Sequence, residues 1–141
     1  MGLKNLGILG FLLFVSFTTT AQTEILGTWL TQDKEAKVEL YKSDGKYYGK
    51  IVWLKNPTDE FGKPVTDVEN PDKALQSRQL INLVILSDLK FDDNEWTDGT
   101  LYDPEKGSTY DSKIWLEDNK TLKVRGYIGF LYETETWTKL N

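Results

Sequence analysis

Residues 109–129 read TYDSKIWLEDNKTLKVRGYIG and contain the pattern that decides the fold. In the second half of this stretch the apolar side chains Leu122, Val124 and Ile128 alternate with Lys, Arg and Tyr. Alternation with a period of two places apolar and polar side chains on opposite faces of a strand. The polar triplet 118–120 (DNK) separates this strand from a preceding extended stretch and is typical of a hairpin turn. Residues 109–129 therefore predict a β-hairpin.

The same pattern extends outward from this hairpin over most of the chain. No helical period continues for more than about two turns, and short polar turns separate the alternating runs. We predict strands at 25–31, 36–42, 47–54, 80–90, 95–103, 109–117, 121–129 and 132–140. Short turns between consecutive strands favour an antiparallel meander, and eight strands can close into a barrel that has no exposed edge. We therefore predict an all-β, eight-stranded barrel, with a two-sheet β-sandwich as the alternative.

One connection, residues 55–79, is much longer than the others. It contains three of the four prolines of the chain, Pro57, Pro64 and Pro71, and one short helical turn is expected near residues 72–76. Long connections in compact domains are usually functional or disordered. This segment is a candidate lid over one end of the barrel, and a packed surface loop without a role is the alternative.

Residues 1–21 have the three parts of a secretory signal. Lys4 provides an early positive charge, an apolar run follows, and small residues precede a boundary at Ala21. A transmembrane anchor is the alternative, but spanning a bilayer takes about 20 apolar residues and the run becomes polar at Thr18. We expect cleavage after Ala21, a single barrel domain at 22–141, and a periplasmic or secreted protein without a transmembrane anchor.

The composition excludes several kinds of chemistry. The chain has no His and no Cys, so it has no Ser-His-Asp triad, no thiol nucleophile and no zinc site built from those residues. The net charge of −5 argues against nucleic acid and anionic membranes as partners, since both attract basic proteins. The acidic stretch at 88–95 lacks the spacing of a calcium-binding EF-hand loop. We expect neither a cofactor nor a metal.

Several stretches, in chain order, resemble a family of exported bacterial proteins known as domain of unknown function 2147. The matching pieces are GTW at 27–29, VELY at 38–41, GKIVWL at 49–54, Asp67, Asn70-Pro71, YDPE at 102–105, Gly107, Tyr110, LKVRGYIG at 122–129 and WT at 137–138. The resemblance covers nearly the whole predicted domain. It implies export and a small domain, but no particular activity.

The opening strand also resembles that of lipocalins and the related fatty-acid-binding barrels. Gly27, Thr28 and Trp29 resemble the Gly-x-Trp motif of lipocalins. The resemblance implies that Trp29 closes one end of the barrel and that a basic residue from a late strand, Arg125 or Lys139, packs over the indole. We assign Gly27, Trp29 and Arg125 to this structural closure.

Aromatic and polar residues on the predicted strands are candidates for ligand binding. Asp103, Tyr110 and Arg125 are expected to form a buried polar cluster, because a buried carboxylate needs a basic or hydroxyl partner. This cluster would serve as a structural latch or as a ligand anchor. The full candidate set is Trp53, Trp96, Tyr102, Asp103, Tyr110, Trp115, Arg125 and Trp137.

Three classes of function remain open from the sequence. The first is an exported, soluble barrel that binds a small or partly apolar molecule in its interior. The second is a structural or protein-interaction module of the cell envelope with a filled core. The third is a hydrolase that uses Glu133 and Glu135, which share one face of the last predicted strand. We expect a binding protein rather than an enzyme.

Overall fold

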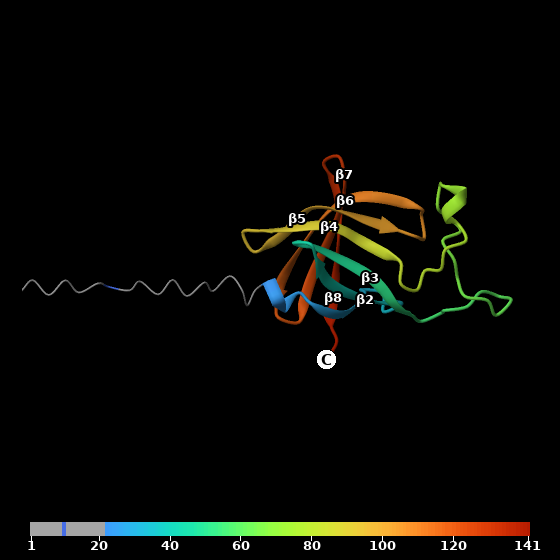
Figure 1. The fold of residues 1–141 in the computed structure, drawn as a ribbon, viewed down its shortest axis with the longest axis horizontal. Coiled ribbons are helices and arrows are strands. Elements are labelled where there is room, and N and C mark those ends of the chain that lie inside the picture. The colour runs from blue at the N-terminus through green and yellow to red at the C-terminus, as the bar shows by residue number, and fades with distance from the viewer. Residues whose placement is uncertain (1–9, 11–21) are drawn as a thin grey trace, which may run out of the picture.

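A computed structural model describes residue 10 and residues 22–141, so the predicted signal segment lies almost entirely outside the described residues. Eight antiparallel strands close into one barrel, each paired with its neighbour in sequence (Figure 1). The strands are β1 (Gly27–Leu30), β2 (Ala36–Ser43), β3 (Lys46–Leu54), β4 (Val84–Asp92), β5 (Glu95–Asp103), β6 (Ser108–Asp118), β7 (Thr121–Ile128) and β8 (Leu131–Lys139). The predicted meander and its closure are confirmed, and the sandwich alternative is not observed.

Two strands begin later than predicted. Residues 22–24 are helical and precede β1, and the carbonyl of Ile25 accepts a 2.9 Å hydrogen bond from the Trp29 indole nitrogen. Residues 80–83 form a turn before β4, in which the Leu83 amide donates to the Leu80 carbonyl and Asn82 has φ of +70°. Because this turn takes up residues 80–83, β4 starts at Val84.

A bulge in β3 changes which side chains face the barrel interior. Val38 of β2 pairs with Ile51, whereas the preceding residue Lys37 pairs with Trp53, so β3 carries one extra residue at this point. An extra residue shifts the alternation of faces by one position. As a result Leu54 lines the interior, while Trp53 is 38% exposed on the outer wall, with Lys37 over its ring.

One end of the barrel is filled by its own side chains. Trp29 and Trp96 are both almost completely buried, and Trp96 packs against Tyr47 and Phe91. This filled half consists of apolar residues from all strands of the barrel; its largest buried members are Trp29, Trp96, Ile25, Leu86, Leu89, Ile114, Leu122 and Val38. The helical residues 22–24 and the β2–β3, β4–β5 and β6–β7 turns lie at this end, as up-and-down topology requires.

The β3–β4 connection, residues 55–83, projects from the barrel on the side opposite the helical residues 22–24 (Figure 1). It contains the expected helical turn as the 3₁₀ helix η1 (Lys73–Leu75), which begins where the Asp72 carboxylate accepts a hydrogen bond from the Ala74 amide. The connection leaves the barrel at the same end as the β1–β2, β5–β6 and β7–β8 turns. These four segments surround the open half of the barrel.

Candidate functional site

A cavity of about 750 Å³ occupies the open half of the barrel. Its volume lies within the range of about 300–1,000 Å³ that is common for ligand pockets. Trp137 and Val124, buried at 2% exposure each, lie between the cavity and the filled half. The apolar part of the wall includes Ile51, Leu54, Ile85, Leu101, Val124 and Trp137. A cavity exists here because β6 and β7 contribute small or polar inward side chains, such as Gly126, in place of large apolar ones.

Carboxylates surround the opening of this cavity. We use the name acidic rim for Asp33, Glu35, Asp103, Glu105, Glu133 and Glu135, all of which line the cavity. They come from the β1–β2 turn, the end of β5 with the turn after it, and the first half of β8. Lys106 is the single basic side chain that lines the same cavity among the described residues.

Hydrogen bonds hold three of the rim carboxylates in place. Asp33 accepts from the Thr31 hydroxyl at 2.7 Å and from the Glu35 amide at 3.0 Å. Asp103 accepts from the Glu105 amide at 2.9 Å. Glu135 accepts a 2.8 Å hydrogen bond from the indole nitrogen of Trp137. None of the six rim carboxylates forms an ion pair with any residue that the structure describes.

Desolvation and the neighbouring carboxylates together change the pKa of Glu105. Partial desolvation, followed by the negative charges of Asp103, Asp33, Glu35 and Glu135, raises the pKa of the Glu105 carboxyl above its ordinary value of 4.5. Oxygen atoms of Asp33, Glu35 and Glu105 all lie within 4.8 Å of one another, and all three residues are exposed. Among the described residues, the cavity lining therefore gathers six carboxylates against the single ammonium of Lys106.

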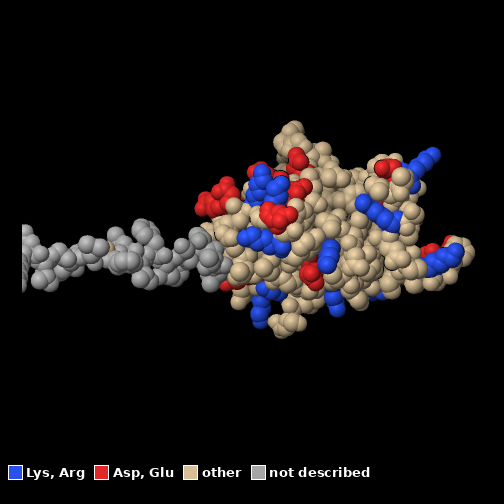
Figure 2. Space-filling view, in the orientation of Figure 1, with Lys and Arg blue, Asp and Glu red and all other residues tan. Residues whose placement is uncertain are grey.

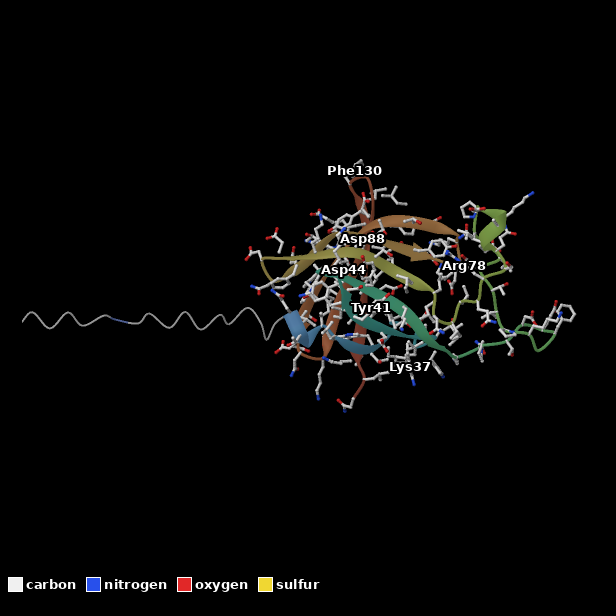
Figure 3. The ribbon with its side chains drawn as sticks, viewed as in Figure 1. Lys37, Tyr41, Asp44, Arg78, Asp88 and Phe130 are labelled. Atoms are coloured by element: carbon white, nitrogen blue, oxygen red, sulfur yellow. The ribbon has the colours of Figure 1, made fainter. Side chains whose placement is uncertain are left out.

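A buried polar cluster ties the long connection to the barrel wall. We call it the Asp67 latch: Asp67, Asn70, Arg78 and Tyr102. Asp67 has no exposed surface and accepts hydrogen bonds from the Tyr102 hydroxyl at 2.6 Å, the Asn70 amide at 2.8 Å and Arg78 Nε at 2.9 Å. Arg78 lies where the connection meets the barrel (Figure 3), and its guanidinium also stacks 5.6 Å from the Tyr102 ring centroid.

The latch determines the charge state of its central carboxylate. Burial alone would raise the pKa of Asp67, but the hydrogen bonds from Tyr102, Asn70 and Arg78 outweigh it and hold the pKa below its ordinary value of 3.8. Desolvation and the hydrogen bond to Asp67 raise the pKa of the Tyr102 hydroxyl above 10.0. Asp67 is therefore an ionised acceptor and Tyr102 a neutral donor at physiological pH.

Comparison with known proteins places the chain in a family. The family model described as an uncharacterized protein conserved in bacteria (DUF2147) matches residues 27–139. The chain belongs to this family. Protein HP1028 from Helicobacter pylori, whose structure is described as belonging to the lipocalin family, superposes with a TM-score of 0.73 at 25% sequence identity, over 83% of each chain. No curated protein matches.

These comparisons confirm both resemblances expected from the sequence. The family match covers the pieces from Gly27 to Trp137, and the similarity to HP1028 agrees with the lipocalin-like opening motif. Among the described residues, no helix combines the length and apolar character that crossing a membrane requires.

The predicted ligand-binding residues of this DUF2147 protein lie in three different parts of the barrel: the cavity, the filled half and the outer wall. Tyr102, Asp103, Tyr110 and Trp137 line the cavity. Trp96 belongs to the filled half. Trp53, Trp115 and Arg125 lie on the outer wall, where Arg125 packs 4.8 Å from the Trp115 ring centroid and 4.0 Å from that of Tyr132. Whether the four cavity residues bind a ligand stays a prediction.

The predicted cluster of Asp103, Tyr110 and Arg125 is not formed. Asp103 and Tyr110 face the cavity, whereas Arg125 points outward and its Nε donates a 2.8 Å hydrogen bond to Thr134. The alternation in β7 already places Arg125 opposite Val124, so the two halves of the predicted cluster lie on opposite sides of the wall. Arg125 therefore takes no part in barrel closure either.

Lys139 is the basic residue over Trp29. Its ammonium lies 5.4 Å from the centroid of the Trp29 ring and donates a 2.6 Å hydrogen bond to the carbonyl of Glu24. The contact joins β8, β1 and the helical residues before β1. Gly27 has φ of +120°, and a Cβ at that position would approach the Lys139 side chain at 3.5 Å. Gly27, Trp29 and Lys139 thus meet at the closed end.

Sequence reasoning missed the latch and half of the acidic rim. Asp67 and Asn70 belong to the pieces shared with the family, which was the available signal, but they lie in a segment without periodicity. Of the rim, only Asp103, Glu133 and Glu135 were considered. Asp33, Glu35 and Glu105 have the appearance of ordinary polar turn residues, and only the closed topology brings them to one opening.

Proposed function

We propose that this protein is an exported binding protein that holds a small, partly apolar ligand in the open half of its barrel. The observation that carries the proposal is the 750 Å³ cavity, whose deep wall is apolar and whose opening is polar. Such a cavity buries the apolar part of a ligand and leaves a polar group at the opening. The lipocalin-like fold supports binding of small molecules in general.

Two further observations support the proposal. Residues 1–21 have the pattern of a secretory signal, which favours action outside the cytoplasm. Glu133 and Glu135, the pair considered for hydrolysis, are both exposed at the opening, and Glu135 is engaged by the Trp137 indole. A solvated carboxylate favours a binding role over that of a catalytic acid, which requires a raised pKa in a desolvated site.

The proposal is tested with a neutral apolar fluorophore, N-phenyl-1-naphthylamine, titrated into the mature protein. We expect saturable fluorescence enhancement that Gly126→Leu abolishes, because a leucine side chain at 126 would extend into the cavity beside Tyr110 and Leu101. Thr97→Leu on the outer wall adds a comparable apolar group and is the control. Circular dichroism of both variants verifies the fold. Equal binding by wild type and a folded Gly126→Leu protein would place the probe elsewhere and refute the proposal.

A second candidate function is supported by the β7–β8 hairpin. Ile128, Phe130, Leu131 and Tyr132 are between 56% and 91% exposed, and Phe130 extends from the hairpin tip, away from the barrel (Figure 3). An exposed apolar group of this kind is suited to contact with an envelope protein. To discriminate the ligand-binding function from the protein-interaction function, a photo-crosslinking residue is placed at position 130 and, as a control, at the exposed position of Glu117. Capture of one partner protein from position 130 but not from position 117 would support the interaction module.

A further inference from the structure

We infer that the ligand of the cavity is a cationic amphiphile, a molecule with a protonated amine or quaternary ammonium head on an apolar body. This inference rests on the proposed function, because the site is the cavity itself, and the charge of its opening only decides which ligands it accepts.

The charge at the opening is strongly one-sided. Six carboxylates line the cavity together with one ammonium, that of Lys106. By contrast, acidic and basic side chains lie next to one another on the face drawn in Figure 2. A concave, partly apolar site lined by one sign of charge concentrates the opposite charge at its mouth. An anionic ligand such as a fatty acid would meet repulsion at this opening.

Within the cavity lining formed by residues 22–141, the single ammonium of Lys106 stands against the six carboxylates of the rim. Several basic side chains of the barrel wall are engaged elsewhere: Arg78 with Asp67, Lys113 with Glu95, and Lys123 with Glu117. Arg125 is packed on outer-wall aromatics, and Lys139 on Trp29 at the opposite end. No rim carboxylate takes part in the ion pairs formed by residues 22–141. A ligand cation would supply the missing countercharge.

The geometry joins the charge to the apolar wall. Glu135 accepts the hydrogen bond of the Trp137 indole at 2.8 Å, so a carboxylate lies directly beside an aromatic ring that is 2% exposed. An ammonium group favours such a combination, since it is attracted both by a carboxylate and by the face of an indole. The head of the ligand would thus lie among Glu105, Glu133 and Glu135, and its apolar body along Ile51, Leu101 and Val124.

The experiment compares three molecules that differ only in the head group. Decylammonium, decanol and decanoate are titrated separately into the mature protein at pH 7 and low salt, below their aggregation concentrations, with calorimetry and tryptophan fluorescence as readouts. We expect the affinity order decylammonium, then decanol, then decanoate, and a loss of the difference at high salt because salt screens exposed charges. Equal affinity for all three would overturn the inference and leave the proposed function standing. Binding by none of them would refute both.

Matched variants assign the effect to the rim. Glu105→Gln and Glu133→Gln should each weaken decylammonium binding by about fivefold, the effect expected for one charge about 4 Å away in a water-like dielectric, while decanol binding stays unchanged. Glu117→Gln, which removes an outer-wall carboxylate, is the control. Calcium chloride alone is the final arm. If calcium bound tightly at the rim and excluded decylammonium, a metal ion would replace the organic cation and overturn the inference.

Discussion

The Tyr102 hydroxyl donates a 2.6 Å hydrogen bond to the Asp67 carboxylate, and this contact joins residues 35 positions apart in sequence. Asp67 belongs to the long connection and Tyr102 to β5, so the bond fixes the connection against the barrel wall. The carboxylate is fully buried, which makes its partners indispensable: a buried charge without hydrogen bonds is strongly unfavourable.

Asp67→Asn should lower the free energy of unfolding by about 2 kcal/mol, because it replaces an ionised acceptor of three hydrogen bonds by a neutral amide. Urea denaturation measures the loss. Tyr102→Phe is combined with it in a double-mutant cycle, in which we expect a coupling of about 1 kcal/mol. Strictly additive effects would show that the 2.6 Å bond contributes no energy of its own.

The depressed pKa of Asp67 also predicts a pH dependence of stability. Below pH 3.8 the unfolded chain takes up a proton that native Asp67 still resists, so the unfolded state binds more protons and stability falls with falling pH. The stabilisation is complete above the ordinary pKa and is lost as the pH drops through the lower native value. As the pH is lowered from 5 to 2.5, the urea concentration at the unfolding midpoint should fall more steeply for wild type than for Asp67→Asn. Parallel curves would assign the acid sensitivity to other carboxyl groups.

Gly107→Ala should destabilise both the β5–β6 turn, in which it lies, and the packing of the β3–β4 connection against that turn. Gly107 has φ of +64°, and a Cβ there would collide with the carbonyl oxygen of Glu69 in the connection. Gly129 provides a matched control, since its φ is +58° but nothing lies within 4 Å of its Cβ position. We expect Gly129→Ala to cost about 1 kcal/mol from the backbone conformation alone, and Gly107→Ala distinctly more. Limited proteolysis within residues 55–83 should accelerate only in Gly107→Ala.

Lys139→Met tests the closure of the filled end. It removes the cation over Trp29 and the hydrogen bond to the Glu24 carbonyl, and should destabilise the protein by about 1–2 kcal/mol. Lys37→Met removes a similar contact, over the outer-wall Trp53, and should cost less than about 0.5 kcal/mol because that ring is already exposed to water. Equal losses in thermal or urea unfolding would mean that burial of the ring does not strengthen the contact.

Much of the fold could be predicted because it is encoded locally. Alternation and short polar turns are sufficient to define eight strands, and consecutive short turns leave little choice but a meander. The bulge in β3 could not be seen in this way. One extra residue opposite Lys37 and Val38 turns Trp53 outward, and no local pattern distinguishes it from a regular strand.

The site was less predictable because it depends on contacts between distant segments. Arg125 and Asp103 looked complementary in charge, yet alternation within β7 sends Arg125 to the outside of the wall. Asp67 obtains Tyr102 as a partner only when the connection folds back on β5. The rim likewise arises from segments that are far apart in sequence. Its acidic residues can be recognised as one group only in the closed barrel, which brings them to the same opening.

The separation of the barrel into a filled half and an open half has an evolutionary consequence. The residues that fill the closed half, such as Trp29, Leu86 and Ile114, are different residues from those in the turns that carry Glu35 and Glu105. If the cavity binds a ligand as proposed, substitutions in those turns would alter its preference while leaving the buried core residues in place. The same folded framework could then serve different specificities that differ in only a few turn residues.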